Sequence, residues 1–331
     1  MKEYSLEPLE FRPILKRLIW GGRKLGRVLG KPIGPESDYA ESWEIADRRD
    51  DVSVVASGRF AGQSLRELVR TRGDELLGAA IGPKEQFPLL VKYLDAERVL
   101  SVQVHPDDEL GARLAGDNGK SEAWFVLQAD PEALIYAGLK PGVDRSTFQR
   151  AIESGTVEPL LHRFHPEPGD CVMIHAGTVH AIGGGVLLAE IQQMSDATFR
   201  VYDWGRVGPN GEPRALHVEQ ALEATDFEIG PVDPLRSPIQ AFESGTYQDL
   251  AECKYFKIKR YRIDRRCAIG SSDRFTIVLG VSGEGEIESS TGARLSVAAG
   301  RTILIPAATG KNIVNPAGTV EFLTCVAPST S

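Results

Sequence analysis

The sequence predicts an all-β protein composed of two jelly-roll barrels with a small helical insert. Three observations indicate this architecture. Short apolar or alternating runs are separated by turn residues along most of the chain, a glycine-centred motif occurs twice with the same internal spacing, and a proline-rich segment separates two β-rich blocks.

The strand prediction depends on runs of four to eight residues bounded by Gly, Pro, Asn and Asp. Such runs are typical of closed or sandwiched antiparallel sheets. The clearest are FPLLVKYLDA, VLSVQVHP, EAWFVLQA, CVMIHAG, VLLAEIQQ and FRVYDW. Helical periodicity occurs only at 64–77, after Pro106, at 144–161 and at 217–224, and we predict helices there.

The segment 227–238 (FEIGPVDPLRSP) is the predicted linker, because it contains three prolines and little apolar periodicity. It divides the chain into an N-terminal domain, 1–227, which carries the helical insert, and a C-terminal domain, 239–331. The second domain is again rich in strand patterns, from KYFKIKRYRID to FLTCVAP.

A repeated motif links the two domains. Gly169 is followed by five residues, His175, four residues and His180, while Gly300 is followed by five residues, Pro306, four residues and Lys311. The spacing resembles the second cupin motif, in which Gly, Pro and His stand at these positions. A recurring turn and strand would give the same spacing, but two copies in one chain favour two cupin-like barrels.

Composition limits the classes of partner. The chain has 331 residues, 42% of them apolar, and 46 acidic against 38 basic side chains, which gives a net charge of −8 without a long single-sign block. We therefore expect no nucleic acid and no membrane as partner. The beginning of the chain lacks the pattern of a signal peptide, and no run approaches the roughly 20 apolar residues of a membrane span, so a cytoplasmic protein is expected. A monomer or homodimer is expected.

The four cysteines are predicted to be reduced structural thiols. They are widely spaced and form no CxxC pair, which argues against a thiolate zinc site and against a disulfide framework. They are Cys171, Cys253, Cys267 and Cys325.

All six histidines precede the predicted linker, so an imidazole-based site belongs to the N-terminal domain. In the second copy of the motif, Lys311 occupies the histidine position, and a charged ammonium group cannot bind a metal. We therefore predict a degenerate C-terminal cupin domain without metal ligands.

Three strand patterns carry pairs of polar residues two positions apart: Gln103 with His105, Lys120 with Glu122, and Glu190 with Gln192. Because side chains alternate across a strand, each pair projects from one face, which predicts a polar barrel interior. Buried polar groups are costly unless they satisfy one another or bind a cation. A set of two imidazoles, one amide and one carboxylate suits zinc and would also accept manganese, iron or cobalt. This set is Gln103, His105, Glu122 and His180.

Longer stretches make the resemblance specific. LSVQVHPDDE, GKSEAWFVL, AGTVHAIGGG and EIQQMSDATFRVYDWGR, in this order, resemble the signature stretches of the type I phosphomannose isomerases in their short bacterial form. The likeness extends to LIWGG, ESWEIAD and LHVEQALEATDF. It implies one zinc ion per chain, held by the same two imidazoles, amide and carboxylate, and a sugar-phosphate pocket lined by Lys120, Glu190 and Arg200.

The resemblance also implies a reaction, the interconversion of mannose 6-phosphate and fructose 6-phosphate through an enediol. This needs a base, a group that stabilises the enediolate, and a cationic clamp for the phosphate. We predict that Glu190, Lys120 and Arg200 are catalytic and also bind substrate. Either Glu190 or a metal-linked group transfers the proton, and Lys120 and Arg200 neutralise the enediolate or the phosphate. Arg206 is predicted to add to the clamp, on the same strand face as Arg200. A non-catalytic sugar-phosphate sensor and an isomerase of another phosphorylated aldose are the alternatives.

Several other polar residues have simpler interpretations. His175, where the motif usually has proline, either joins the metal ligands or lies at a strand end with a surface or backbone partner, and the second interpretation is preferred. The acids after Pro106 fit the N-cap and first turn of a helix. Lys92 is expected to face solvent, His217 to be a surface or packing residue, and Glu41 and Glu44 to be structural.

Overall fold

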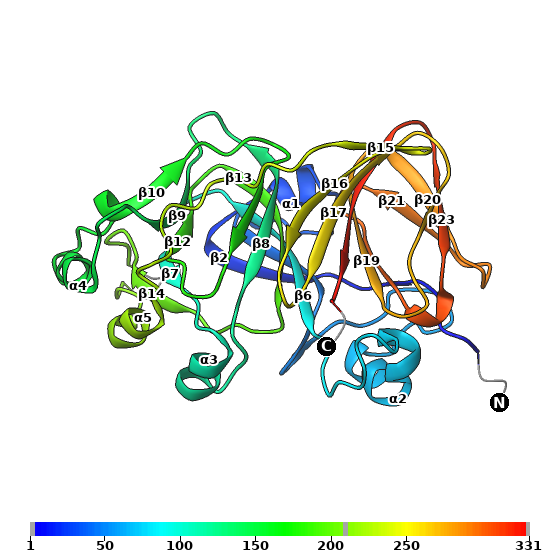
Figure 1. Cartoon of the computed structure of the whole chain (residues 1–331), viewed down its shortest axis with the longest axis horizontal. Coiled ribbons are helices and arrows are strands. Elements are labelled where there is room, and N and C mark those ends of the chain that lie inside the picture. Colours follow the sequence, from blue (N-terminus) through cyan, green and yellow to red (C-terminus); the bar gives the residue numbers. More distant parts are fainter. Residues whose placement is uncertain (1–3, 208–210, 329–331) are drawn as a thin grey trace.

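Four antiparallel β-sheets follow one another across the molecule (Figure 1) in the computed structural model, which describes residues 4–207 and 211–328. The prediction of a mostly β protein is confirmed. Residues up to 227, here called the first half, supply a five-stranded and a six-stranded sheet. The residues after them, the second half, supply most of a seven-stranded and all of a four-stranded sheet.

Neighbouring strands in the first two sheets are mostly not consecutive in the sequence. In spatial order, the five-stranded sheet contains β10 (Leu161–Phe164), β9 (Ile135–Leu139), β12 (His180–Ile182), β7 (Val102–Val104) and β14 (Phe199–Tyr202). The six-stranded sheet contains β11 (Cys171–Ile174), β8 (Glu122–Ala129), β13 (Val186–Gln193), β6 (Leu89–Ala96), β3 (Tyr39–Ile45) and β2 (Ile14–Gly22).

The other two large sheets belong mainly to the second half. The seven-stranded sheet contains β1 (Leu9–Glu10), β22 (Thr302–Ile305), β19 (Thr276–Ser282), β24 (Val320–Val326), β17 (Lys257–Ile263), β16 (Gly245–Glu252) and β15 (Gln240–Phe242). The four-stranded sheet contains β18 (Cys267–Ile269), β23 (Asn312–Pro316), β20 (Glu284–Glu288) and β21 (Arg294–Ala298). A small ribbon pairs β4 (Asp47–Arg48) with β5 (Asp51–Val52).

The helices are short and lie at several places around the sheets. The four predicted helices are present as α2 (Leu65–Leu77), α3 (Asp108–Ala115), α4 (Arg145–Ser154) and α5 (Val218–Ala224), and α1 (Lys24–Arg27) adds one turn. Helix α4 ends seven residues before the predicted end. The reason is Gly155, whose positive φ of 69° caps the helix, after which a 3-10 turn, η1 (Glu158–Leu160), leads into β10.

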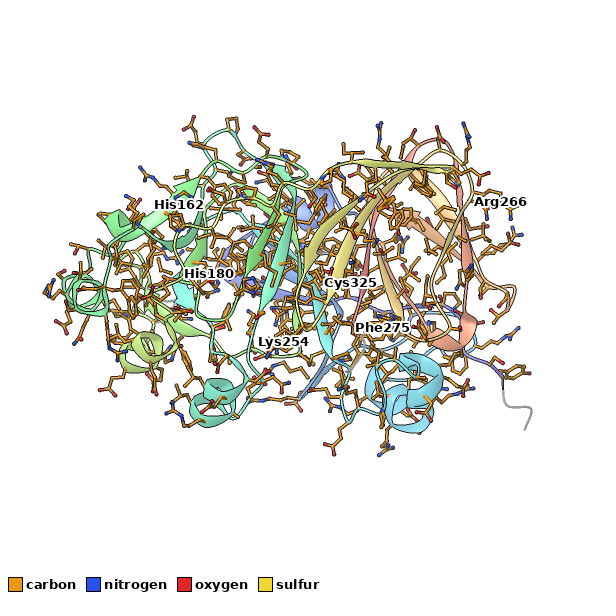
Figure 2. The ribbon with its side chains drawn as sticks, in the orientation of Figure 1. His162, His180, Lys254, Arg266, Phe275 and Cys325 are labelled. Carbon is orange, nitrogen blue, oxygen red and sulfur yellow. The ribbon has the colours of Figure 1, made fainter. Side chains whose placement is uncertain are left out.

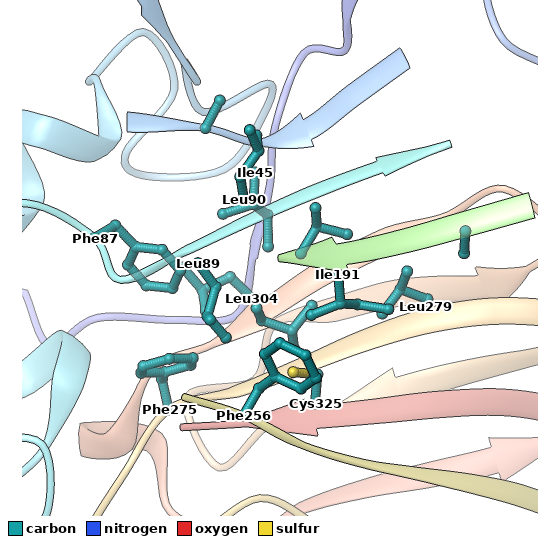
Figure 3. Close-up of a cluster of buried hydrophobic side chains, with 14 of the residues drawn as sticks. Ile45, Phe87, Leu89, Leu90, Ile191, Phe256, Phe275, Leu279, Leu304 and Cys325 are labelled. Atoms are coloured by element: carbon teal, nitrogen blue, oxygen red, sulfur yellow. The ribbon is translucent and has the colours of Figure 1, made fainter. Parts of the chain in front are cut away.

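Alternation along the strands places apolar side chains on both faces of the inner sheets. On β24, Leu323 and Cys325 face the six-stranded sheet, whereas Val320 and Phe322 face the four-stranded sheet. The large cluster between the six-stranded and seven-stranded sheets joins both halves of the chain, and Figure 3 shows its centre. The space between the two sheets of the second half contains an apolar cluster of its own.

The two copies of the repeated motif have the same local structure. Gly169 and Gly300 both have positive φ, 94° and 76°, and a strand, β11 or β22, begins two residues after each glycine. The motif therefore marks an equivalent turn and strand in each half. Lys311 is exposed, beyond the 3-10 turn η2 (Ala307–Thr309).

The predicted linker runs along the first half before β15 begins, with backbone bonds from Val232 to Ala137 and from Leu235 to Cys171. The N-terminal strand β1 crosses the predicted division, because it pairs with β22 of the second half. The domain boundaries stay a prediction. In the ranges that the structure describes, no helix is both long and apolar enough to cross a membrane.

Candidate functional site

The site is built where the two sheets of the first half face each other. On the five-stranded sheet, β7 lies between β12 and β14, and the register places Gln103 opposite both His180 and Arg200. His105 follows β7 directly. On the six-stranded sheet, Glu122 begins β8 and pairs with Gln192, while Glu190 pairs with Lys92 of β6. The predicted polar pairs thus come together from neighbouring strands.

His105, Glu122 and His180 form a compact buried cluster. Their ligand atoms all lie within 4.8 Å of one another, and all three residues are fully buried. Glu122 Oε2 lies 3.5 Å from His105 Nε2, and Glu122 Oε1 lies 3.5 Å from His180 Nε2. Figure 2 shows His180 within the first half of the molecule, among its strands.

Backbone carbonyl groups fix the orientation of both imidazole rings. His105 Nδ1 lies 2.9 Å from Ala197 O, and His180 Nδ1 lies 2.9 Å from Thr178 O. A carbonyl oxygen only accepts, so Nδ1 carries the proton in each ring and donates it. The lone pairs on both Nε2 atoms therefore point into the cluster, as in histidines that bind a metal.

The charges in the cluster match the requirements of a cation site. Burial lowers the pKa of His105, and the positive charge of Lys120 lowers it further. Burial also lowers the pKa of His180, and the neighbouring His105 adds to this effect. Both rings are therefore neutral at pH 7. Burial alone would raise the pKa of Glu122, but Lys120 and His105 outweigh it and hold that pKa well below its usual range. Neutral imidazoles and an ionised carboxylate are the forms that coordinate metals.

Among the described residues, two atoms of the cluster make no hydrogen bond: His105 Nε2, and Glu122 Oε2, which has only the ion pair with Lys120 Nζ at 3.2 Å. With a neutral ring and an ionised carboxylate, both atoms are acceptors, and they face each other at 3.5 Å. Such an arrangement is costly unless a cation lies between the two atoms. The residues therefore fit a metal ion, as the sequence predicted.

Gln103 lies beside this cluster but presents its amide nitrogen. Its Nε2 is 3.2 Å from His180 Nε2, so it donates toward the imidazole lone pair. Coordination through the amide oxygen, as predicted, needs the amide turned by half a rotation about its last side-chain bond. Its place opposite His180 is compatible with either orientation.

A cleft of about 550 Å³ opens next to the cluster. Three of the residues predicted to bind substrate line it, namely Lys120, Glu190 and Arg200, together with Gln103. Further charged or polar side chains of the cleft are Lys16, Arg17, Glu41, Asp51, Lys92, Ser101, Asp196, Thr198 and Arg214.

Lys92 was expected to face solvent, and this expectation was wrong. Its side chain is 5% exposed, and its ammonium group lies 3.2 Å from Glu190 Oε1 and 5.0 Å from the centre of the Trp43 ring. The reason is that β6 is central in its sheet, with the cleft on one face and the large core on the other. Burial alone would lower the pKa of Lys92, but Glu190 and Glu41 outweigh it and raise the pKa.

Glu190 is the carboxylate of the cleft with a raised pKa. Burial raises it first, and repulsion from Glu122 adds to the effect, while Lys92 and Lys120 oppose it. A carboxyl group with its pKa raised toward neutrality can exchange protons with a bound molecule at working pH. Lys120 Nζ lies 3.2 Å from Glu122 Oε2 and so stands between the metal cluster and the cleft.

Arg200 is half-buried at the edge of the cleft and is held on two sides. Its side chain donates to Ser101 Oγ at 3.3 Å and to Ala215 O at 2.9 Å. His217 is the residue before α5, and its Nδ1 accepts from the Arg200 backbone N–H at 3.1 Å. It therefore packs against β14, in agreement with the expected packing role, and holds the backbone of Arg200. Burial and the neighbouring Arg214 both lower the pKa of Arg200.

The structure does not bring Arg206 to the cleft. Strand β14 ends at Tyr202, and Trp204 has a positive φ of 58°, which turns the chain away before Arg206. The Arg206 guanidinium donates instead to Asp203 and to Val99 O. Arg214, which sequence reasoning missed, lines the cleft and is held by two bonds to Asp203 of 2.7 and 2.5 Å.

His175 lies outside the metal cluster. It is exposed directly after β11, and its carbonyl accepts from Thr178 N at 3.0 Å, which matches the interpretation as a strand-end residue. Glu44 forms a buried ion pair with Lys31 at 2.7 Å and is structural, as expected. Glu41 lines the cleft and accepts from Trp43 Nε1 at 2.5 Å, so the structural interpretation of Glu41 was incomplete.

Comparison with known proteins decides the family. The chain is 35% identical to a probable mannose-6-phosphate isomerase, GmuF, of Bacillus subtilis (strain 168), over 96% of this chain and 98% of that protein. The chain belongs to the type I phosphomannose isomerase family. The family model described as "Phosphomannose isomerase type I, catalytic domain" matches residues 9–131, a range that includes Gln103, His105 and Glu122.

Other members support this assignment to the phosphomannose isomerases. The mannose-6-phosphate isomerase ManA of the same bacterium is 35% identical, over 86% of this chain and 89% of that one. The crystal structure of the mannose 6-phosphate isomerase from Bacillus subtilis superposes with a TM-score of 0.88 and 29% identity, covering 97% of this chain and 99% of that one. The family resemblance inferred from the sequence is confirmed.

Proposed function

We propose that this phosphomannose isomerase interconverts mannose 6-phosphate and fructose 6-phosphate by proton transfer through an enediol. The proposal is supported mainly by the adjacency of two parts: a buried cluster with two acceptor atoms that make no hydrogen bond, and a cleft in which Glu190, Lys120 and Arg200 converge. The activities named for its relatives agree with this chemistry.

We propose zinc as the metal, one per chain, held by His105, Glu122, His180 and the Gln103 amide oxygen. Two imidazoles with oxygen ligands suit zinc, and manganese, iron or cobalt would be accepted by the same set. When bound, the ion supplies positive charge that polarises substrate oxygens and stabilises an enediolate.

Glu190 is the proposed base. Its carboxylate takes the proton from carbon 2 of the open-chain aldose, the electrons of that C–H bond form the C1–C2 double bond of the enediol, and the π electrons of the aldehyde move to oxygen 1. The carboxylic acid so formed then returns the proton to carbon 1, and the hydroxyl proton of oxygen 2 is transferred to oxygen 1, so that carbon 2 becomes the ketone with no net gain or loss of protons. Lys92, at 3.2 Å, keeps Glu190 in contact with a cation.

Lys120 and Arg200 are the residues proposed to neutralise the negative charge of the substrate. Lys120 is next to the metal cluster and thus to the reacting carbons, where its ammonium group neutralises the enediolate. Arg200 lines the same cleft, where its guanidinium is proposed to donate to the charge that develops on the enediolate, and Arg200 and Arg214 also bind the phosphate with paired donors. Arg206, which donates to the Asp203 that holds Arg214, remains a proposed support of the phosphate region.

The decisive experiment is a coupled assay with mannose 6-phosphate before and after removal of metal by a chelator. We expect activity that is lost on chelation and restored by zinc. The assay is repeated with other phosphorylated aldoses at the same concentration. Activity with another aldose alone would change the proposed substrate, and tight binding without turnover on every sugar phosphate would indicate a sensor.

A further inference from the structure

We propose that Asp108 is a positioning residue, which connects the second half of the molecule, through Tyr255, to the backbone segment 119–121 that sets the place of Lys120. The inference deepens the proposed function and rests on it, because Lys120 is there a catalytic residue. It also gives the second half, for which no metal ligands are predicted, a part in the site.

The segment 119–121 is held at three consecutive backbone N–H groups. Gly119 N donates to Asp108 Oδ1 at 3.1 Å, and Lys120 N donates to Pro106 O at 2.9 Å. Ser121 N donates to Gln193 Oε1 at 2.8 Å. Gln193 is itself tied to Asp108, because its Nε2 donates to Oδ1 at 2.9 Å. The Asp108 carboxylate thus accepts directly from the N–H of the residue before Lys120, and it positions Gln193, which accepts from the N–H of the residue after Lys120.

Close packing adds to these bonds. A Cβ atom at Gly119 would lie 2.4 Å from the carbonyl carbon of Asp107, so the segment lies directly against the start of α3. Asp107 is the N-cap of that helix, with its side chain accepting from Leu110 N at 2.8 Å. The cap function is therefore filled by Asp107, and the carboxylate of Asp108 is available for the segment.

The other oxygen of Asp108 contacts the second half of the molecule. Tyr255 OH donates to Oδ2 at 2.6 Å, and Lys254 Nζ lies 3.4 Å from the same atom. Both residues lie in the turn between β16 and β17, and Figure 2 shows Lys254 at the junction of the two halves. Hydrogen bonds to an ionised carboxylate are stronger than those between neutral groups.

The position of Lys120 depends on this support. Its ammonium group lies 3.2 Å from Glu122 Oε2, and the next residues along the chain enter β8. A displacement of about 1 Å at a reacting group is enough to lower turnover by roughly a hundredfold. Loosening the segment 119–121 should therefore lower turnover, although no side chain that contacts the substrate has changed.

The first test measures the segment itself, in the full-length, metal-free protein. Amide hydrogen exchange is followed by mass spectrometry in Asp108→Ala and Tyr255→Phe. We expect faster exchange at 119–121 in both variants. Two matched controls should leave it unchanged: Glu109→Ala removes a charge from the same helical turn, and Tyr247→Phe removes another hydroxyl of the second half, which donates to Gln240 at 2.6 Å.

The second test measures kinetics with mannose 6-phosphate. In Asp108→Ala we expect kcat to fall by about tenfold with KM within about twofold of wild type, and Asp108→Asn, which keeps an acceptor oxygen, should recover most of it. Unchanged exchange at 119–121 in both Asp108→Ala and Tyr255→Phe would overturn the inference. A wild-type chain inactive on mannose 6-phosphate would refute the proposed function, and the exchange experiment would still decide the linkage.

Discussion

At the scale of single residues, the orientation of two imidazole rings determines what the site can bind. Both rings donate through Nδ1 to a backbone carbonyl, which leaves both Nε2 lone pairs directed at Glu122. The donors are therefore organised before any ion arrives. This organisation reduces the cost of ordering the ligands when a metal binds.

The first prediction is that His105→Ala and His180→Ala each lose bound metal and activity together, because each removes one of two imidazole donors. Metal content of the purified variants is measured by elemental analysis. His175→Ala is the matched control, since His175 is exposed and outside the cluster. A full complement of metal in His180→Ala would contradict the assignment of the ligands.

The second prediction concerns Arg200. A donor directed at charge that develops in the transition state is worth about 3 to 4 kcal/mol, so Arg200→Ala should lower kcat by roughly two to three orders of magnitude. Arg200→Lys keeps the charge but loses the planar pair of donors, and it should recover little of that loss. Steady-state kinetics decide the matter. A normal kcat with a raised KM would place Arg200 in phosphate binding alone.

The sequence predicted His105 and Glu122 because two-residue spacing of polar side chains is a strong signal in a strand, and His180 because it stands at the histidine position of the repeated motif. It failed for Lys92, whose neighbours on β6 are apolar on both faces, so nothing local distinguishes a cleft lysine from an exposed one. Arg214 lies beyond the strand that carries Arg200, and only tertiary contacts to Asp203 bring it to the cleft. Such contacts have no local pattern.

At the scale of elements, the end of β6 contains a buried carboxyl group, Asp95, whose ionisation is unfavourable. Asp95 is fully buried, its Oδ2 accepts from Lys24 N at 2.5 Å, and its Oδ1 has no partner among the described residues. Burial raises the pKa of Asp95 to about 6, although the Lys24 backbone N–H acts in the opposite direction. The unfolded value is about 3.9, so the folded state binds this proton more tightly.

The third prediction follows from that difference. Between about pH 4 and 6 the folded state holds a proton that the unfolded state has released, so this group lowers stability as pH rises through the window. Asp95→Asn removes the titration. The free energy of unfolding of the variant minus that of wild type should therefore increase from pH 4 to 6 and then stay constant. Denaturant titrations at several pH values measure it, and a constant difference across the window would contradict it.

The second half of the molecule is expected to hold no catalytic side chain. The interior between its two sheets is apolar, and Lys311 is exposed at the position of the motif histidine. The fourth prediction is that Lys311→Ala keeps kcat and KM near the wild-type values in the mannose 6-phosphate assay. A hundredfold loss in a folded variant would show that this half contributes chemistry. The support that Tyr255 gives to Asp108 is a separate, structural contribution.

Elements were predictable where a local signal exists. Helix α3 was expected from its N-cap acid and α2 from its periodicity, and both begin within one or two residues of the expected place. The pairing of β1 with β22 joins residues almost three hundred positions apart. Strand β1 is only two residues long, which is too short to show a strand pattern in the sequence. Long-range pairing of this kind depends on the whole fold, so it was not predictable from the segment itself.

At the scale of the whole molecule, the two halves share their largest core. Side chains of β6 and β13 pack against those of β19 and β24, and Figure 3 shows Leu89 and Ile191 near Leu304 and Cys325. The strand β1 and the bond between Tyr255 and Asp108 cross the same boundary. With a buried apolar contact of this extent, each half would expose a large apolar face if the other unfolded.

The last prediction is that the two halves unfold together. All four tryptophans, Trp20, Trp43, Trp124 and Trp204, lie in the first half, so their fluorescence reports that half, whereas far-ultraviolet circular dichroism reports both. Leu323 is fully buried in the shared core, and Leu323→Ala should cost about 2 to 5 kcal/mol. If the two halves unfold as a single cooperative unit, Leu323→Ala lowers the denaturant concentration at the unfolding midpoint by the same amount in fluorescence and in circular dichroism. An unchanged fluorescence midpoint, with dichroism splitting into two transitions, would show that the halves are independent.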